Sequence, residues 1–298
     1  MNILTFDIED WFHILDHGTT RGEMQWMRFE SRIQRNTDRI LEVLARKNRK
    51  ATFFCLGWIA KRYPEVIKKI DSLGHDVGSH SYLHQLAYEQ SREEFRSDLN
   101  RSIQIISDLT GKKVRSYRAP GFSFTRENTW VFDCLAEAGI EYDCSIFPAR
   151  RAHGGFDDFG ADMPAIVKCH SGQVKEFPIN TVSILGRPFV FSGGGYFRLL
   201  PYFYVKGQML RSQYVMCYFH PRDFDPGQPV LNDLPAARRF KSYVGLNTAF
   251  GKFGKLLDDF MFYDLSRANA MIDWTHAQAI ALDTPEKEQE AGKWEKSA

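Results

Sequence analysis

The sequence lacks the features of several protein classes, and each absence narrows the possibilities. Its five cysteines are scattered, odd in number and without a Cys-x-x-Cys pair, which argues against a disulfide framework and against a cysteine zinc site. Its 39 basic residues nearly balance its 37 acidic residues, and no basic stripe is present, so a nucleic acid is not an expected partner. No apolar run is long enough to cross a bilayer, and no basic and apolar leader opens the chain. These absences predict a soluble protein located in the cytoplasm, either free or at the inner face of the membrane.

The chain of 298 residues alternates strand-like with helix-like segments. Strand-like runs such as "NILTF", "KATFFCLG" and "HDVGSH" are separated by segments with helical periodicity at 32–47, 64–73, 91–110 and 127–138. This rhythm predicts an α/β fold in which helices connect parallel strands. Ser91 and Glu94 have the spacing of a capping box, which places the start of the third helix.

The pattern changes after about residue 225. Segments such as "AARRFKSYVGL" and "AFGKFGKLLDDFMFYDL" are amphipathic and lack a strand pattern, so 226–280 is predicted to be a helical extension packed on a main domain at 1–225. The last stretch, 281–298, is charged and almost without apolar residues, which predicts a disordered tail.

Three carboxylates follow the first strand within four positions: Asp7, Glu9 and Asp10. Like charges that are buried together need a cation or must protonate, so a divalent ion is the expected neutraliser. One carboxylate would bind the ion, and another would act as a base near a water whose pKa the ion lowers. The alternative interpretation, for Asp10 alone, is a helix cap.

His80 and His84 in "HSYLH" are four residues apart, so on one helical turn both side chains would face the same cation. Such a pair also arises by chance, but the acidic cluster favours a metal site. Two imidazoles and a carboxylate suit one Zn²⁺, with Co²⁺, Ni²⁺ and Mn²⁺ as alternatives. A metallopeptidase is disfavoured, because Ser81 stands where the His-Glu-x-x-His motif has its glutamate.

Five segments, in this order and spacing, carry a family resemblance: "TFDIED", "HSYLH", "RAPGFSF", "YDCSIFP" and "CYFHP". They resemble the signature motifs of the polysaccharide deacetylases of the NodB-homology type, carbohydrate esterase family four, over roughly Met1 to Asp225. "EFPINTV" and "FSGGGYFRLLPY" resemble the subgroup found with bacterial exopolysaccharide loci, which has its own C-terminal extension. The resemblance implies a deformed (β/α) barrel and hydrolysis of an N-acetyl group on an amino sugar of an exopolysaccharide or surface glycan.

The resemblance also implies roles for single residues. Asp7 matches the catalytic base, and Arg118 matches the arginine that binds the base carboxylate. His220 matches the general acid, and Asp143 matches the acidic residue expected to orient the imidazole of His220. The two histidines of "HSYLH" match the metal ligands.

The first motif departs from the family pattern. Its common form has two adjacent aspartates, base then ligand, whereas here Ile8 follows Asp7. Strand alternation places Asp7 and Glu9 on one face, which favours Glu9 as the ligand. A turn beginning at Ile8 would instead bring Asp10 to the metal. Both Glu9 and Asp10 therefore stay candidates.

A sugar substrate would stack on aromatic side chains, and the candidates near the expected site are Trp11, Phe122 and Tyr196. Most aromatic residues of a chain belong to the core, which is the alternative for each. The three glycines at 193–195 would permit close backbone approach to a ligand or a mobile loop, or form only a tight turn.

Two other functions share these residues. A related hydrolase could cleave a non-sugar amide with the same metal, base and acid. A non-catalytic sugar-binding subunit would use the aromatic residues without turnover. The carrier of the sugar (nucleotide, lipid or polymer) and the oligomeric state are left open by the sequence.

Overall fold

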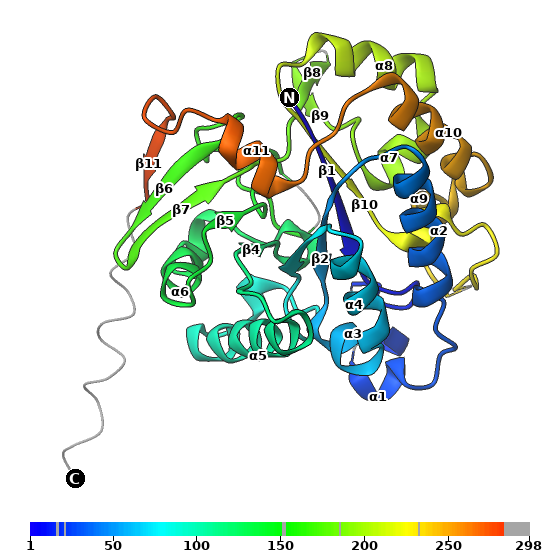
Figure 1. Ribbon diagram of the computed structural model, residues 1–298, viewed down its shortest axis with the longest axis horizontal. Helices are drawn as coiled ribbons and strands as arrows, with labels where there is room; N and C mark the ends of the chain where they lie inside the picture. Colours follow the sequence, from blue (N-terminus) through cyan, green and yellow to red (C-terminus); the bar gives the residue numbers. More distant parts are fainter. Residues whose placement is uncertain (16–17, 21, 151–152, 185, 232, 283–298) are drawn as a thin grey trace.

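The computed structural model describes residues 1–15, 18–20, 22–150, 153–184, 186–231 and 233–282. A nine-stranded sheet runs through the molecule (Figure 1). Its strands are β1 (Asn2–Ile8), β2 (Thr52–Cys55), β3 (Asp76–Ser79), β4 (Ser116–Tyr117), β5 (Tyr142–Asp143), β6 (Ala165–Cys169), β7 (Gly172–Glu176), β10 (Val215–Phe219) and β11 (Ala279–Ala281). A separate hairpin consists of β8 (Val182–Ile184) and β9 (Arg187–Phe189).

The strands lie in the order β10-β1-β2-β3-β4-β5-β7-β6-β11, and every neighbouring pair is parallel except β6 and β7. This confirms the prediction of an α/β fold with parallel strands. Within the described ranges, no pairing joins β10 to the far side of the sheet, so hydrogen bonds do not close the sheet into a barrel.

The helices are α1 (Glu23–Trp26), α2 (Ile33–Arg46), α3 (Gly57–Arg62), α4 (Pro64–Ser72), α5 (Arg92–Thr110), α6 (Val131–Glu137), α7 (Gly194–Leu199), α8 (Tyr202–Arg211), α9 (Ala236–Tyr243), α10 (Leu246–Asp259) and α11 (Leu265–Met271). Helices α2, α4 and α5 agree with the predicted segments to within a residue at each end. The capping box at α5 is confirmed: the Glu94 amide donates to Ser91 Oγ at 3.2 Å, and the Ser91 amide donates to Glu94 Oε2 at 2.8 Å. Helix α6 begins later than predicted, because residues 126–128 form a 3₁₀ turn of their own.

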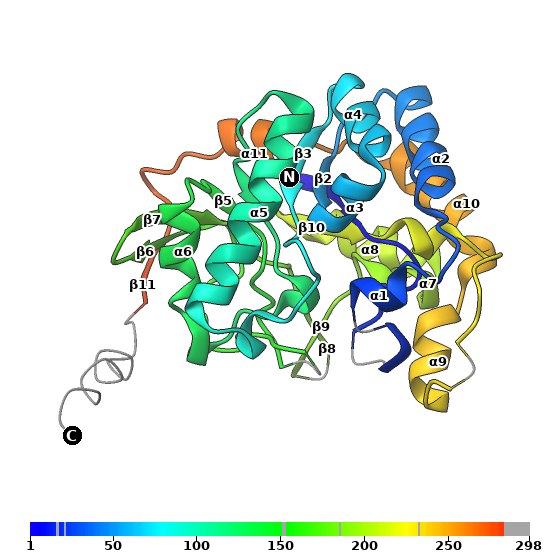
Figure 2. The same ribbon diagram turned by 90° about the horizontal axis from the view of Figure 1, so that it is seen from below.

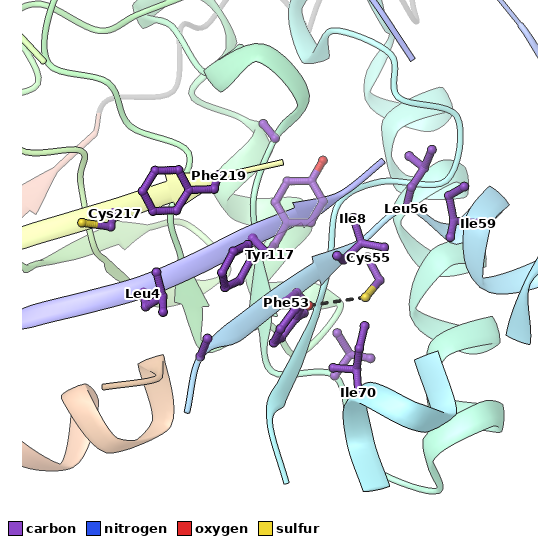
Figure 3. Close-up of a cluster of buried hydrophobic side chains, with 14 of the residues drawn as sticks. Leu4, Ile8, Phe53, Cys55, Leu56, Ile59, Ile70, Tyr117, Cys217 and Phe219 are labelled. Atoms are coloured by element: carbon purple, nitrogen blue, oxygen red, sulfur yellow. Dashed lines mark hydrogen bonds between the residues drawn. The ribbon is translucent and has the colours of Figure 1, made fainter. Parts of the chain in front are cut away.

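The core lies where the central strands meet the helices that cover them. Strand β1 is buried from Ile3 onward, as expected for a central parallel strand covered on both faces. Figure 3 shows its Leu4 and Ile8 among side chains from β2, α3, α4, β4 and β10. The rings of Phe6 and Phe53 stack with centroids 4.9 Å apart. Cysteines fill part of this core: all five thiols are free, and every cysteine except Cys169 is buried.

The C-terminal segment contains helices α9, α10 and α11. Helix α10 lies beside α2 in both views (Figures 1 and 2), where the guanidinium of Arg39 lies 4.6 Å from the ring centroid of Phe250 and Lys47 pairs with Asp258. The segment is not wholly helical, because β11 pairs with β6 in parallel. An open sheet edge offers unpaired backbone groups to any extended neighbour, even one with little strand pattern. Residues 283–298, most of the predicted tail, lie outside the described part.

The parallel arrangement brings distant residues to one edge of the sheet. Glu9 follows β1, His80 follows β3, Arg118 follows β4 and His220 follows β10. The carboxyl ends of parallel strands meet at the same edge, so these four side chains converge there. None of the described helices is both long and apolar enough to cross a membrane.

Candidate active site

Three buried side chains could bind one metal ion. Glu9, His80 and His84 each offer one ligand atom, and these atoms all lie within 4.8 Å of one another. Glu9 Oε2 and His84 Nε2 lie 2.5 Å apart. Two imidazoles and one carboxylate form the ligand set of zinc sites that keep a coordination position for water or substrate.

The loop after β3 presents the two histidines in a way that the sequence did not predict. Residues after His80 do not form a helical turn: Ser81 and His84 have positive φ angles of 65° and 55°. The backbone amide of His84 donates to Ser81 Oγ at 3.0 Å, which fixes this loop. His80 Nδ1 lies 2.8 Å from the carbonyl oxygen of Arg118. A carbonyl only accepts, so Nδ1 carries the proton and Nε2 is left to bind a metal.

Glu9, not Asp10, lies with the histidines. The carboxylate of Asp10 is used by the start of α2. Its Oδ1 accepts from the amide of Trp11 at 2.8 Å, and its Oδ2 accepts from Ser31 Oγ at 2.6 Å and from the amides of Arg32 and Ile33 at 2.9 and 3.2 Å. These donors leave Asp10 as a helix cap, the alternative interpretation of this residue.

The residues present fit a cation. Glu9 Oε2 is buried and accepts no hydrogen bond from any residue that the structure describes. Its close neighbour His84 Nε2 is a second electron-pair donor, and two such atoms are stable at this distance only with a proton or a metal ion between them. Burial lowers the pKa of His80 to about 4, which keeps this imidazole neutral and able to bind a metal at physiological pH.

Arg118 contacts Asp7 as expected from the resemblance. Its Nη1 donates to Asp7 Oδ1 at 2.8 Å and to Thr5 Oγ1 at 2.8 Å, and its Nε donates to the carbonyl of Cys144 at 3.2 Å. The guanidinium is completely buried. Burial opposes its charge, but Asp7 more than offsets this and raises the pKa of Arg118. The contact therefore fixes the Asp7 carboxylate beside the candidate metal ligands.

His220 lies between Glu9 and Asp7. Its Nε2 is 3.1 Å from Glu9 Oε1 and 3.7 Å from Asp7 Oδ2, and its side chain is 23% exposed, so a substrate can reach it. The other ring nitrogen, Nδ1, lies 3.0 Å from Asp223 Oδ2. Burial alone would lower the pKa of His220, but Glu9 and Asp223 raise it to about 9. In the metal-free site these two carboxylates therefore favour the protonated imidazole, which can donate a proton from Nε2.

The residue that orients His220 is Asp223, and the prediction of Asp143 for this role is wrong. Asp143 accepts hydrogen bonds from Ser145 Oγ at 2.6 Å and from the Ser145 amide at 3.1 Å, and it is hydrogen bonded to Glu176. Burial raises its pKa. Ser145 Oγ in turn accepts from the amide of Ala119, so Asp143 supports the backbone next to Arg118 instead.

A sequence signal for Asp223 exists. It stands three residues after His220, across Pro221, and its carboxylate also accepts from the backbone amide of His220 at 2.8 Å. Burial opposes its charge, but His220 and Arg198 lower the pKa of Asp223 to about 2. This i, i+3 acid within "HPRDF" could have been weighed against Asp143.

Arg198 is a second site residue that the sequence did not predict. It is 6% exposed, and its Nε lies 3.0 Å from Asp223 Oδ1. Its other nitrogens donate to three carbonyls at and after the end of α9, those of Lys241, Ser242 and Val244, at 2.8 to 3.0 Å. The C-terminal segment thus fixes Arg198, which contacts Asp223, which contacts His220. No sequence pattern marks Arg198, because all its partners are distant along the chain.

Two of the three predicted stacking residues are core residues. Trp11 is 4% exposed and packs against Phe12 and Phe29, and Phe122 is 5% exposed and packs against Tyr218. Neither offers a free ring face, so these two predictions are wrong. Tyr196 is 39% exposed on α7, and its sugar-stacking role stays a prediction.

The glycine run serves close approach of two backbone segments. Gly193 forms a bridge with Tyr218 of β10, and a Cβ atom at position 193 would lie 2.3 Å from the ring of Tyr218. Gly194 has a φ of 50° and begins α7. Close approach was one of the predicted alternatives, although the partner is the chain itself.

Two regions of the chain match known sequence families. Residues 17–142 match the polysaccharide deacetylase family, and residues 144–270 match a domain of unknown function, DUF3473. The second match begins well before the predicted boundary at 225, and it includes His220, Asp223 and Arg198. Residues of both regions therefore meet in the candidate site.

Curated relatives match over short segments. A peptidoglycan-N-acetylglucosamine deacetylase of Bacillus cereus is 34% identical over 84 residues, which cover 28% of this chain and 30% of the relative. A peptidoglycan deacetylase of Helicobacter pylori is 31% identical over 108 residues, 36% of each chain. The matched segment thus spans about a third of the length of these relatives.

A solved structure matches over nearly the whole chain. A predicted polysaccharide deacetylase from Mycobacterium smegmatis superimposes with a TM-score of 0.65, over 96% of this chain and 94% of that chain, at 21% identity. This likeness shows a shared fold. The family matches show that the chain carries a polysaccharide deacetylase domain of NodB homology, carbohydrate esterase family four, and after it a DUF3473 domain.

Proposed function

We propose that the protein is a metal-dependent hydrolase that removes N-acetyl groups from an amino sugar. The observation that carries the proposal is the convergence of Glu9, His80 and His84 on one point, with Asp7 and His220 beside them. Base, acid and metal ligands of amide hydrolysis are thus within reach of one reacting group. The names of the curated relatives support an N-acetylated sugar as the substrate.

Zn²⁺ fits the ligand set of Glu9, His80 and His84 best, with Co²⁺, Ni²⁺ or Mn²⁺ as alternatives. When bound there, the ion would polarise the acetyl carbonyl and lower the pKa of a water molecule.

Asp7 removes the proton from the attacking water. Arg118 binds Asp7 Oδ1 and stabilises the charged carboxylate, while Asp7 Oδ2 faces His220. Arg118 therefore fixes the base through one carboxylate oxygen and does not block the other.

His220 donates a proton from Nε2 to the leaving amine. Asp223 accepts from Nδ1–H, which fixes the orientation of the ring, and its negative charge stabilises the imidazolium. Arg198 holds Asp223 in place from the other side. Base and acid are separate residues, so each can be tested by itself.

We further propose that the substrate belongs to an exopolysaccharide or surface-glycan pathway and is modified in the cytoplasm or at the inner face of the membrane. The sequence resemblance to the exopolysaccharide-locus subgroup supports the pathway.

An acetate-release assay over nucleotide-linked, lipid-linked and polymeric N-acetyl sugars tests the proposal, with metal analysis of the same sample and Asp7→Asn as the inactive control. We expect chelation to abolish release and a divalent ion to restore it. Release from a simple amide but from none of the sugars would support the non-sugar hydrolase instead. A protein that binds sugars, holds no metal and releases no acetate would be a non-catalytic subunit.

A further inference from the structure

Two carboxyl groups meet in the core beside the candidate site, and the reaction steps above involve neither of them. Asp143 ends β5 and Glu176 ends β7, and the parallel register of these strands pairs the two residues. Both are completely buried, and their side chains are hydrogen bonded to each other. Among the described residues, Arg118 is the cation that faces Glu176, but its charge is already paired with Asp7. Two buried carboxylates cannot both stay charged in contact, so the pair must hold a proton.

The hydrogen bonds assign this proton to Glu176. Both oxygens of Asp143 accept, Oδ1 from Ser145 Oγ at 2.6 Å and Oδ2 from the Ser145 amide at 3.1 Å. Glu176 Oε1 also accepts, from the Ile146 amide at 3.1 Å. The buried Oε2 of Glu176 receives no hydrogen bond from any donor group in the described part of the chain. Oε2 is therefore the oxygen that carries the hydrogen and donates it to Asp143.

The charges around the pair agree with this assignment. Burial raises the pKa of both carboxyl groups, and the charge of Asp143 raises that of Glu176 further, well above its usual value of 4.5. Three other titratable groups face the pair: Tyr117 from β4, Cys144 after β5 and Tyr214 before β10. Burial raises the pKa of each well above its ordinary value, so all three are neutral and none supplies a positive charge. Glu176 is thus a neutral acid at physiological pH.

The turn after β5 links the pair to Arg118. The two carboxyl groups accept from the two backbone amides that follow Cys144. The carbonyl of Cys144 itself accepts from Arg118 Nε at 3.2 Å. Ser145 Oγ, which donates to Asp143, accepts from the backbone amide that follows Arg118 at 2.8 Å. The pair therefore fixes a turn that contacts Arg118 through both its side chain and its backbone.

We propose that Asp143 and Glu176 share one proton, which Glu176 carries, and that this neutral acid is a positioning residue of the reaction. Through the turn after β5 it orients the guanidinium of Arg118 toward Asp7. The inference rests on the proposed function, in which Asp7 is the base. Asp143 lies between the two family matches and Glu176 lies within the second, so the second matched region supports the base from behind the site.

Substitutions at the two carboxyl groups test which of them carries the proton. Glu176→Leu removes both hydrogen bonds of this side chain and should lower kcat for acetate release about tenfold or more. Glu176→Gln keeps an accepting oxygen and a donor but cannot ionise, so it should recover most of that loss. Asp143→Asn has one accepting oxygen where two are used, so it should lower kcat more than Glu176→Gln does. Glu42→Gln, exposed on α2, is the matched control.

Two readouts of the proton need no turnover. The infrared difference spectrum between the wild type and Glu176→Gln at neutral pH should contain the carbonyl band of a protonated carboxylic acid, and the difference between the wild type and Glu42→Gln should lack it. The second readout is urea unfolding of the full chain. The folded wild type keeps a proton that the unfolded chain releases above pH 4.5, so its stability falls with pH. The unfolding constant of the wild type, divided by that of Glu176→Gln, should therefore rise about tenfold per pH unit.

The outcomes separate this inference from the proposed function. NMR of the Arg118 Nε–H should show a shift in Glu176→Leu and almost none in Glu176→Gln. If this shift, the carboxyl band and the pH dependence are found but no sugar loses acetate, the shared proton and its positioning role stand and the proposed reaction fails.

If acetate is released but the carboxyl band is absent, or Asp143→Asn is more active than Glu176→Gln, the inference fails while deacetylation stands. A Glu176→Leu protein that melts earlier but keeps the wild-type kcat would also overturn it, because Glu176 would then serve stability alone. If Glu176→Leu does not fold, the order of Glu176→Gln and Asp143→Asn and the infrared band still decide.

Discussion

Glu9 and Asp10 are adjacent, but replacing each carboxylate by an amide should affect a different quantity: metal affinity for Glu9 and the stability of the fold for Asp10. Glu9 lies with the two histidines, and Asp10 accepts four hydrogen bonds from Trp11 and from the residues that begin α2. Glu9→Gln should therefore weaken the metal site and leave the melting temperature of the metal-free protein close to that of the wild type. Asp10→Asn should do the reverse.

The magnitudes follow from the contacts. Structural zinc sites with four ligands have binding free energies of about 10–16 kcal/mol, so one ligand contributes about 3 kcal/mol and its loss weakens Zn²⁺ binding by about a hundredfold or more. Asp10→Asn keeps an acceptor at the cap but loses the negative charge and at least one hydrogen bond, at a cost of about 2–3 kcal/mol. In a domain of this size, that lowers the melting temperature by about 5–10 °C.

Two assays on the same preparations decide the matter: competition for Zn²⁺ with a chromophoric chelator, and thermal unfolding of metal-free protein followed by circular dichroism. Asp157→Asn is the matched control, since Asp157 is an exposed acid that pairs with Arg150 on the surface, and it should change neither quantity. If Asp10→Asn weakens Zn²⁺ binding more than Glu9→Gln does, the assignment of the ligand is refuted.

Three further predictions concern the base, the acid and the fold around them. Asp7→Asn should lower kcat by about 10²–10⁴-fold with little change in KM, because a base acts in the transition state; a pure KM effect would count against this role. Asp223→Asn should lower kcat about 10- to 100-fold, and Arg198→Met should also lower kcat. Steady-state kinetics measure this, and an unchanged kcat in both variants would show that neither residue orients His220. In the metal-free protein, NMR titration should give His220 a pKa of about 9, above its unfolded value of 6.5. The contribution of His220 to the free energy of unfolding is then complete below pH 6.5 and disappears as the pH rises through 9. Asp223→Asn should lower both this pKa and this contribution, and an unshifted pKa in the wild type would contradict the contact between His220 and Asp223.

The sequence by itself determined what depends on short-range interactions. The bounds of α2, α4 and α5 follow from apolar periodicity and, at Ser91, from a capping box that closes within one turn. The acids after the first strand and the histidine pair could be recognised in the sequence because the members of each group lie close together along the chain. Their convergence followed from the parallel order of strands, since the carboxyl ends of parallel strands meet at one edge.

Tertiary structure decided everything that depends on partners far along the chain. Asp10 is a cap because Ser31 and Ile33 reach it from more than 20 positions away, and that leaves Glu9 for the metal. His220 pairs with Asp223 and not with Asp143, because Ser145 and Glu176 occupy the carboxyl group of Asp143. Trp11 and Phe122 are buried by packing that no local pattern encodes. A side chain's residue type fixes the chemistry that it can perform, but its neighbours in space fix which of those roles it has, and these neighbours are set by the packing of the whole chain.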